Sequence, residues 1–221
     1  MTPCLNFLPM PHIKLVIFDL DGTLVDAYTA ITNSFNYTMR RLGYPQQDAL
    51  YIRRAVGWGD RNLLKPFVKP QELSRALSIY RRHHAQSLRK DSRLVPGARR
   101  LLEHLVSGGY AVAVASNRPT RFSRIIIRHL NVGRYFSYVL CADTLPHGKP
   151  HPEILRRIMR RFCFSPSETL YVGDMAIDAQ AGRRAKVRTA IVTGGSSKRA
   201  DIAKQAPWRI VAKLEHLRRF L

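Results

Sequence analysis

The sequence predicts an α/β protein with a Rossmann-like, doubly wound parallel sheet and an inserted all-helical domain. Short apolar runs, typical of strands buried on both faces, alternate along most of the chain with segments whose apolar residues recur every three or four positions. This alternation implies right-handed crossovers and a parallel sheet covered by helices on both sides. It stops once, between residues 26 and 94, where only helical patterns occur.

The first expected strand is the run from Lys14 to Asp19. The other expected strands are similar apolar runs at residues 110–115, 138–141, 169–172, 188–192 and, more weakly, 208–211. The expected helices between them are the amphipathic segments 99–106, 120–130, 153–162 and 176–185.

The inserted segment has two long amphipathic patterns. One runs from Ala27 to Leu42 and stops at Gly43, and the other begins after Pro70 and includes residues 73–88. Shorter helical pieces are expected at residues 48–56 and 62–67. We therefore expect an α/β core domain made of residues 1–25 and 95–221, and a helical cap domain made of residues 26–94.

The charge is strongly positive, with 37 Lys and Arg against 15 Asp and Glu and a net charge of +22. Such a charge attracts polyphosphate backbones, anionic lipid or small anionic substrates. Many arginines occur as adjacent pairs on expected helix surfaces, and no basic stripe is interleaved with aromatic residues as in RNA-binding modules. Nucleic acid therefore remains a secondary alternative as a partner.

Membrane insertion and secretion are not expected. No apolar run reaches the roughly 18 residues that span a bilayer, and residues 1–12 resemble neither a secretory signal nor a transit peptide; Met10 is an alternative start. The three cysteines, Cys4, Cys141 and Cys163, are odd in number and lack CxxC spacing. They fit a reducing cytoplasm.

Carboxylates follow two of the expected strands. Asp19 and Asp21 come directly after the first, on a loop that Gly22 lets turn sharply, and Asp174 and Asp178 follow the strand at 169–172. Ligands of open α/β sheets bind at the carboxyl ends of the strands, so these acids should gather at one edge. A helix-capping role explains such a cluster poorly, whereas Mg²⁺ prefers oxygen ligands and would relieve the repulsion.

Two further strand ends supply groups that suit a phosphate. Ser116 and Asn117 follow the strand at 110–115 and precede a helix N-terminus, which is a ready anion site. Lys149 lies before the helix at 153–162 and offers a compact positive charge. Taken alone, each of these is an ordinary loop residue.

Taken together and in order, these motifs resemble those of the haloacid dehalogenase superfamily. The matching residues are Asp19-x-Asp21-Gly22-Thr23, Ser116-Asn117, Lys149-Pro150 and Gly173-Asp174-x-x-x-Asp178. The helical insert, with Leu24-Val25-Asp26, Pro96-Gly97 and Ala181-Gly182, resembles the phosphoglycolate phosphatase-like subfamily. The resemblance extends from Lys14 to about Gly195.

The resemblance implies a Mg²⁺-dependent phosphatase that acts on a small phosphate monoester. Asp19 would attack phosphorus and form an aspartyl-phosphate, and Asp21 would act as general acid and base. Mg²⁺ would be held by Asp19, the Asp21 backbone carbonyl and Asp174, with Asp178 in support. Ser116, Asn117 and Lys149 would bind the phosphoryl group.

The loop of residues 53–59 lies where capped relatives contact the substrate. Arg54, Gly57 and Trp58 are therefore candidate specificity residues, although a cap surface explains them equally well. The arginines of this loop favour a small, strongly anionic substrate.

Other activities share this architecture. Asp21 argues against a dehalogenase, and nothing marks Lys65 or Lys69 as the Schiff-base lysine of a phosphonoacetaldehyde hydrolase. A β-phosphoglucomutase-like phosphotransferase shares the core motifs and stays open. A basic protein that binds polyanions or nucleic acid is the alternative outside enzymology.

Overall fold

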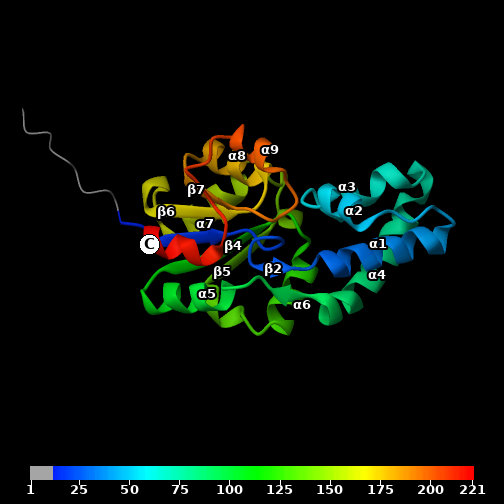
Figure 1. The fold of residues 1–221 in the computed structure, drawn as a ribbon, viewed down its shortest axis with the longest axis horizontal. Helices are drawn as coiled ribbons and strands as arrows, with labels where there is room; N and C mark the ends of the chain where they lie inside the picture. Colours follow the sequence, from blue (N-terminus) through cyan, green and yellow to red (C-terminus); the bar gives the residue numbers. More distant parts are fainter. Residues whose placement is uncertain (1–11) are drawn as a thin grey trace, which may run out of the picture.

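Six parallel strands form the central sheet of the computed structural model, which describes residues 12–221 (Figure 1). The strands are β1 (Leu15–Phe18), β4 (Ala111–Ser116), β5 (Tyr138–Cys141), β6 (Thr169–Gly173), β7 (Arg188–Val192) and β8 (Arg209–Val211). All six expected strands are confirmed, and so is the α/β fold class. Cys4 and Met10 lie outside the described residues.

The strand order β5-β4-β1-β6-β7-β8 places β1 at the centre of the sheet. Phe18, the last residue of β1, is in register with Val114 of β4 on one side and with Val172 of β6 on the other. The chain winds outward from β1 through β4 and β5, then returns to β6 on the other side. The order therefore reverses between β1 and β6, which is where open α/β sheets bind their ligands.

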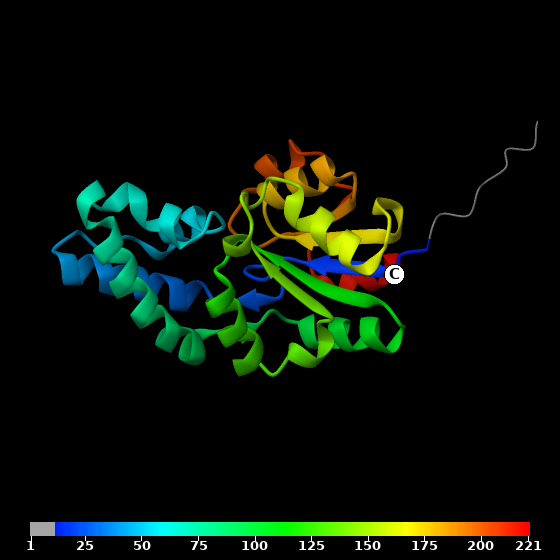
Figure 2. The ribbon, with the colours of Figure 1, turned by 180° about the vertical axis from the view of Figure 1, so that it is seen from behind.

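Helices cover both faces of the sheet (Figures 1 and 2). On one face lie α5 (Ala98–Ser107), α6 (Thr120–His129) and the 3₁₀ helix η6 (Leu214–Phe220), and on the other α7 (Glu153–Phe162), α8 (Ala176–Ala185) and α9 (Arg199–Ala203). Short 3₁₀ turns lie in the loops: η3 (Gly133–Tyr135), η4 (Ala142–Thr144) and η5 (Pro166–Glu168).

Successive side chains of β1 explain this double cover. Val16 and Phe18 pack against the first group of helices, and Leu15 and Ile17 pack against the second, because a strand directs alternate side chains to opposite faces. All four are fully buried. A strand that is apolar at every position therefore needs both helical layers.

The helical insert projects from one end of the core (Figure 1). Its elements are α1 (Tyr28–Leu42), α2 (Ala49–Ala55), α3 (Asp60–Leu64), η1 (Lys65–Phe67), η2 (Pro70–Glu72) and α4 (Leu73–Asp91). Phe35 and Met39 of α1 pack with Leu77 and Tyr80 of α4 in a hydrophobic cluster separate from those of the sheet. Gly43 ends α1 in the left-handed conformation, as expected.

Two short strands join the insert to the core, and neither was expected. β2 (Val25–Asp26) pairs antiparallel with β3 (Arg93–Leu94) where the chain enters and leaves the insert. A pairing of two residues per strand leaves no periodicity in the sequence. The junctions thus lie side by side near the expected boundaries, while the division into two domains stays a prediction.

The arginine pairs lie on helix surfaces. Four arginines of α7 and two of α8 are exposed: Arg156, Arg157, Arg160, Arg161, Arg183 and Arg184. Most of the positive charge on these helices therefore faces solvent. Within residues 12–221, no helix has the length and apolar composition needed to cross a membrane.

Candidate active site

The loop after β1 places Asp19 and Asp21 at the reversal point of the sheet. The backbone N–H of Asp19 donates to the Val172 carbonyl at 2.8 Å and so extends the strand pairing. Gly22 has φ of 79°, and a Cβ at this position would lie 2.4 Å from Oδ2 of Asp174. Glycine is therefore required both for the turn and for the approach of the two loops.

Three buried carboxylates meet beyond the ends of β1 and β6. Asp19, Asp174 and Asp178 each offer a ligand atom, and these atoms lie within 4.8 Å of one another. Asp178, in the first turn of α8, accepts from the backbone N–H groups of Asp174 at 3.3 Å and Met175 at 3.0 Å. Asp174 accepts from the Ser196 N–H at 3.1 Å. Backbone N–H groups therefore fix the carboxylates of Asp174 and Asp178.

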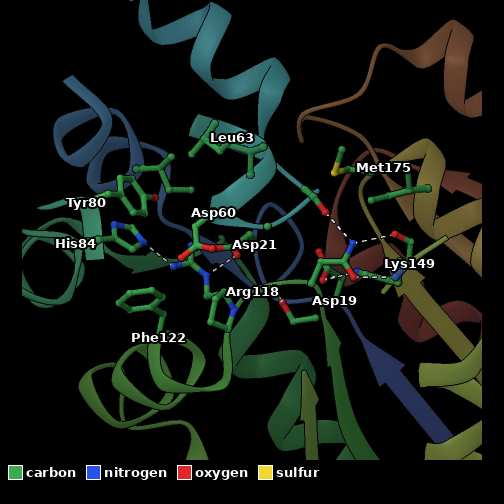
Figure 3. Close-up of a pocket in the computed structure, with 18 residues that line it drawn as sticks. Asp19, Asp21, Asp60, Leu63, Tyr80, His84, Arg118, Phe122, Lys149 and Met175 are labelled. Atoms are coloured by element: carbon green, nitrogen blue, oxygen red, sulfur yellow. Dashed lines mark hydrogen bonds and ion pairs between the residues drawn. The ribbon is translucent and has the colours of Figure 1, made fainter. Parts of the chain in front are cut away.

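Lys149 lies among these carboxylates, and Figure 3 shows it beside Asp19. Its Nζ is 2.6 Å from Asp19 Oδ1, 2.7 Å from Asp178 Oδ1 and 3.1 Å from the Tyr171 hydroxyl. Burial lowers the pKa of Lys149, but Asp178 and Asp19 raise it more, so the ammonium stays charged. Lys149 therefore places a buried positive charge directly beside the carboxylates of Asp19 and Asp178.

One lysine does not balance three buried acids. Burial raises the pKa of Asp19 to about 7 against the opposing effect of Lys149, and the Asp178 charge raises it further. The pKa of Asp174 is held well above its ordinary value by burial and then by Asp178 and Asp19. A cluster with excess negative charge and only oxygen ligands fits a hard divalent cation such as Mg²⁺.

We expect the metal-free protein to lose stability as pH rises from about 4 to about 7. The folded state holds a proton on Asp19, whose pKa is about 7, that the unfolded chain releases near 3.8. The free energy of unfolding should therefore fall by up to about 1.4 kcal/mol per pH unit in this window. Thermal unfolding in EDTA would measure the slope.

The matched variant for this measurement is Asp19→Asn, which cannot titrate. The difference between the two slopes reports the titration of Asp19 together with its effect on the neighbouring Asp174. Equal slopes for the two proteins would contradict the raised pKa.

Asn117 ties three segments together through its side chain. Its amide donates to the carbonyls of Gly57 at 2.9 Å and Lys149 at 3.0 Å, and its oxygen accepts from the Lys149 N–H at 2.8 Å. The predicted phosphate contact of Asn117 could thus come only from its backbone. Ser116 is buried at the end of β4, where its hydroxyl accepts from the Arg118 N–H at 3.2 Å.

Arg118 was not among the predicted site residues. Its guanidinium holds both carboxylate oxygens of Asp21 at 2.6 Å, and its Nη1 is 2.8 Å from Nε2 of His84 in α4 (Figure 3). The side chain is only 6% exposed. The signal in the sequence was its position, one residue beyond Ser116-Asn117, but many loops of this arginine-rich chain contain an arginine.

A cavity, partly open to solvent, lies between this cluster and the helical insert. Asp19, Asp21, Ser116, Asn117 and Lys149 all line it. The remaining wall is largely apolar and includes Ile31, Val56, Leu63, Tyr80, Phe122, Met175 and Ile177.

The predicted specificity loop is only partly at this cavity. Gly57 lines it, whereas Arg54 and Trp58 are not among the lining residues, and Trp58 is 47% exposed. Arg53 lies over the Tyr28 ring and donates to the Gly194 carbonyl. The arginines that favoured an anionic substrate therefore do not face the cavity.

Residues 16–192 of this 221-residue chain match the family model of the haloacid dehalogenase-like hydrolases. The chain belongs to this family. The hydrolase motifs recognised in the sequence thus lie in the matched region, and the resemblance to the family is confirmed.

Curated relatives of this hydrolase are named phosphoglycolate phosphatases. The chain is 31% identical over 213 residues to phosphoglycolate phosphatase 1 of Pseudomonas aeruginosa, with 92% of this chain and 78% of the relative covered. It is 33% identical over 202 residues to the phosphoglycolate phosphatase of Nitrosospira multiformis, with 88% of each covered.

Solved structures share the fold of this hydrolase. A predicted phosphoglycolate phosphatase from Haemophilus somnus superposes with a TM-score of 0.90 at 27% identity, covering 96% of this chain and 99% of that one. CbbY from Rhodobacter sphaeroides, solved with phosphate, shares the fold with a TM-score of 0.82 at 19% identity, covering 93% and 96% of the two chains.

Proposed function

We propose that this hydrolase is a Mg²⁺-dependent phosphatase that cleaves a small, phosphoglycolate-like phosphate monoester through an aspartyl-phosphate on Asp19. The observation that carries the proposal is the buried group of Asp19, Asp174 and Asp178 around Lys149, beside a cavity that is partly open to solvent. The names of the relatives support the substrate class.

The side chains of Asp19 and Asp174, with the backbone carbonyl of Asp21, would hold Mg²⁺. Asp178 would support them from its backbone-anchored position. When bound, the ion would neutralise charge on the carboxylates and on the phosphoryl oxygens. The donor set suits this ion because it consists of oxygens only.

In the first step, Asp19 attacks phosphorus, an acyl-phosphate bond forms and the bond to the leaving oxygen breaks. Asp21 gives that oxygen a proton. In the second step, Asp21 takes a proton from a water that attacks phosphorus, and phosphate and the Asp19 carboxylate are released. Ser116 and Lys149 hold the phosphoryl oxygens and stabilise their charge.

Residues 26–94 would act as a cap over this reaction. Contacts from the insert to the core support this role, namely Gly57 to Asn117 and His84 to Arg118. A closed cap would exclude water from the cavity while Asp19 is phosphorylated. The cytoplasmic location and a secondary affinity for nucleic acid stay predictions.

We expect phosphate release from a panel of small phosphate esters with Mg²⁺, and at least about a 100-fold lower rate with EDTA, equivalent to roughly 2.7 kcal/mol of barrier. Phosphoglycolate should rank among the best substrates. The test is colorimetric phosphate release with a metal-replacement control.

Equal rates with Mg²⁺ and EDTA would contradict the metal dependence. A mutase would instead interconvert sugar phosphate isomers without net release of phosphate. Product analysis on a hexose phosphate with a bisphosphate primer therefore separates the two activities.

A further inference from the structure

The cavity has two cationic residues at its wall among the described residues, and they lie in different settings. Lys149 contacts the nucleophile Asp19, whereas Arg118 contacts Asp21 and the α4 residue His84 (Figure 3). The proposed phosphatase reaction uses Lys149 for the phosphoryl group. It leaves Arg118 without a part in binding substrate.

Arg118 has hydrogen-bonding capacity to spare. A guanidinium carries five N–H groups. Its Nε and one N–H of Nη2 bind Asp21, and one N–H of Nη1 binds His84. One N–H on each terminal nitrogen thus remains without an acceptor within residues 12–221. Leaving buried donors unpaired costs free energy, so the site is suited to an added acceptor.

Other groups at this wall do not supply that acceptor. Both carboxylate oxygens of Asp60 accept from Arg81, at 2.7 and 3.1 Å. Since a guanidinium only donates, Nε2 of His84 accepts from Arg118, which places the single ring proton on Nδ1. His84 is therefore neutral and contributes neither a second anion nor a competing charge.

We propose that Arg118 binds an anionic group on the part of the substrate that departs with the ester oxygen. The planar guanidinium matches the two oxygens of a carboxylate, so the anionic group is a carboxylate. The proposal rests on the proposed phosphatase function and names the residue that selects the substrate. Arg118 holds Asp21 at 2.6 Å, so the anion lies close to the leaving oxygen and its carbon chain is short. The apolar wall formed by Leu63, Tyr80 and Phe122 offers few partners to a hydroxyl-rich sugar.

The arrangement gives one guanidinium three partners: the proton donor Asp21, the cap residue His84 and the substrate tail. Binding of the substrate carboxylate to Arg118 would therefore affect the position of Asp21 and of His84 in α4 together. Esters of the same size without the charge would leave two buried donors unpaired and would be poor substrates.

The test compares 2-phosphoglycolate with 2-hydroxyethyl phosphate, which replaces the carboxylate by a hydroxymethyl group. With Mg²⁺, the wild-type protein should prefer the carboxylate ester by at least about 30-fold in kcat/KM, or roughly 2 kcal/mol. In Arg118→Met this preference should fall to within about 3-fold. Arg121→Met, at an exposed position in α6, is the matched control and should keep the wild-type preference.

A purely structural role for Arg118 would lower kcat/KM for both esters equally and leave their ratio unchanged, which would overturn the proposal. A wild-type protein that cleaves both esters equally well would also overturn it, while the proposed phosphatase function would stand. Absence of phosphate release from either ester would overturn both.

A second measurement uses only the wild-type protein, so it does not depend on whether the Arg118→Met variant folds. Glycolate, which carries the carboxylate, should inhibit the wild-type protein competitively, and ethylene glycol at the same concentration should not. Equal inhibition by the two would count against the proposal.

Discussion

Replacement of Asp19 by Asn should abolish turnover while leaving the fold intact. The amide is not a nucleophile, so the loss of kcat should be at least about 10⁴-fold. In EDTA at pH 8 the variant should be as stable as wild type or more stable, since burial and Asp178 act against the Asp19 charge. Phosphate release and thermal unfolding, each with and without Mg²⁺, would measure both effects.

Asp201→Asn is the matched control, because Asp201 is an exposed acid in α9. It should change neither activity nor the stabilisation by Mg²⁺, whereas Asp19→Asn should reduce that stabilisation. Activity in Asp19→Asn above about a tenth of wild type would rule out the covalent mechanism.

Lys149→Met should damage both activity and stability. The ammonium is 2% exposed and contacts Asp19 and Asp178, so its removal leaves two buried carboxylates without their cation. We expect the free energy of unfolding to fall by about 3 kcal/mol in EDTA at pH 8. The rate should fall at least about 10³-fold, because the charge on the phosphoryl oxygens loses a partner.

The loss of stability should be smaller at pH 5, where Asp19, whose pKa burial raises to about 7, carries a proton and no longer repels its neighbours. It should be smaller again with Mg²⁺. Lys204→Met removes a lysine that is 73% exposed and should cost less than about 0.5 kcal/mol. A Lys149→Met protein with wild-type stability at pH 8 would show that the lysine does not compensate the acids.

The strands and core helices could be predicted because each has a pattern of its own. β1 is apolar at every position, and α7 occupies the residues of its expected helix, Glu153–Phe162. The proximity of Asp19 and Asp174 could also be predicted, because each follows a strand of a parallel sheet and parallel strands end at the same edge. Local sequence was sufficient for these features.

Contacts between distant segments could not be predicted in this way. The pairing of Arg118 with Asp21 spans 97 residues, and its contact with His84 depends on how α4 lies against α6. Likewise, the sequence could not tell that Trp58 points to solvent. These features depend on the packing of the insert against the core, for which one sequence carries no periodic signal.

The hydrogen bonds of Asn117 have a consequence for the timing of catalysis. The same amide nitrogen holds the Gly57 carbonyl of the insert and the Lys149 carbonyl of the core. Movement of the insert away from the core would break the first bond and leave the second free to shift. With residues 26–94 as the proposed cap, we expect Lys149 to bind phosphate less tightly when the insert moves away from the core. Product release and movement of the insert would then occur together. In such an enzyme, solvent viscosity would slow turnover of the best substrates most.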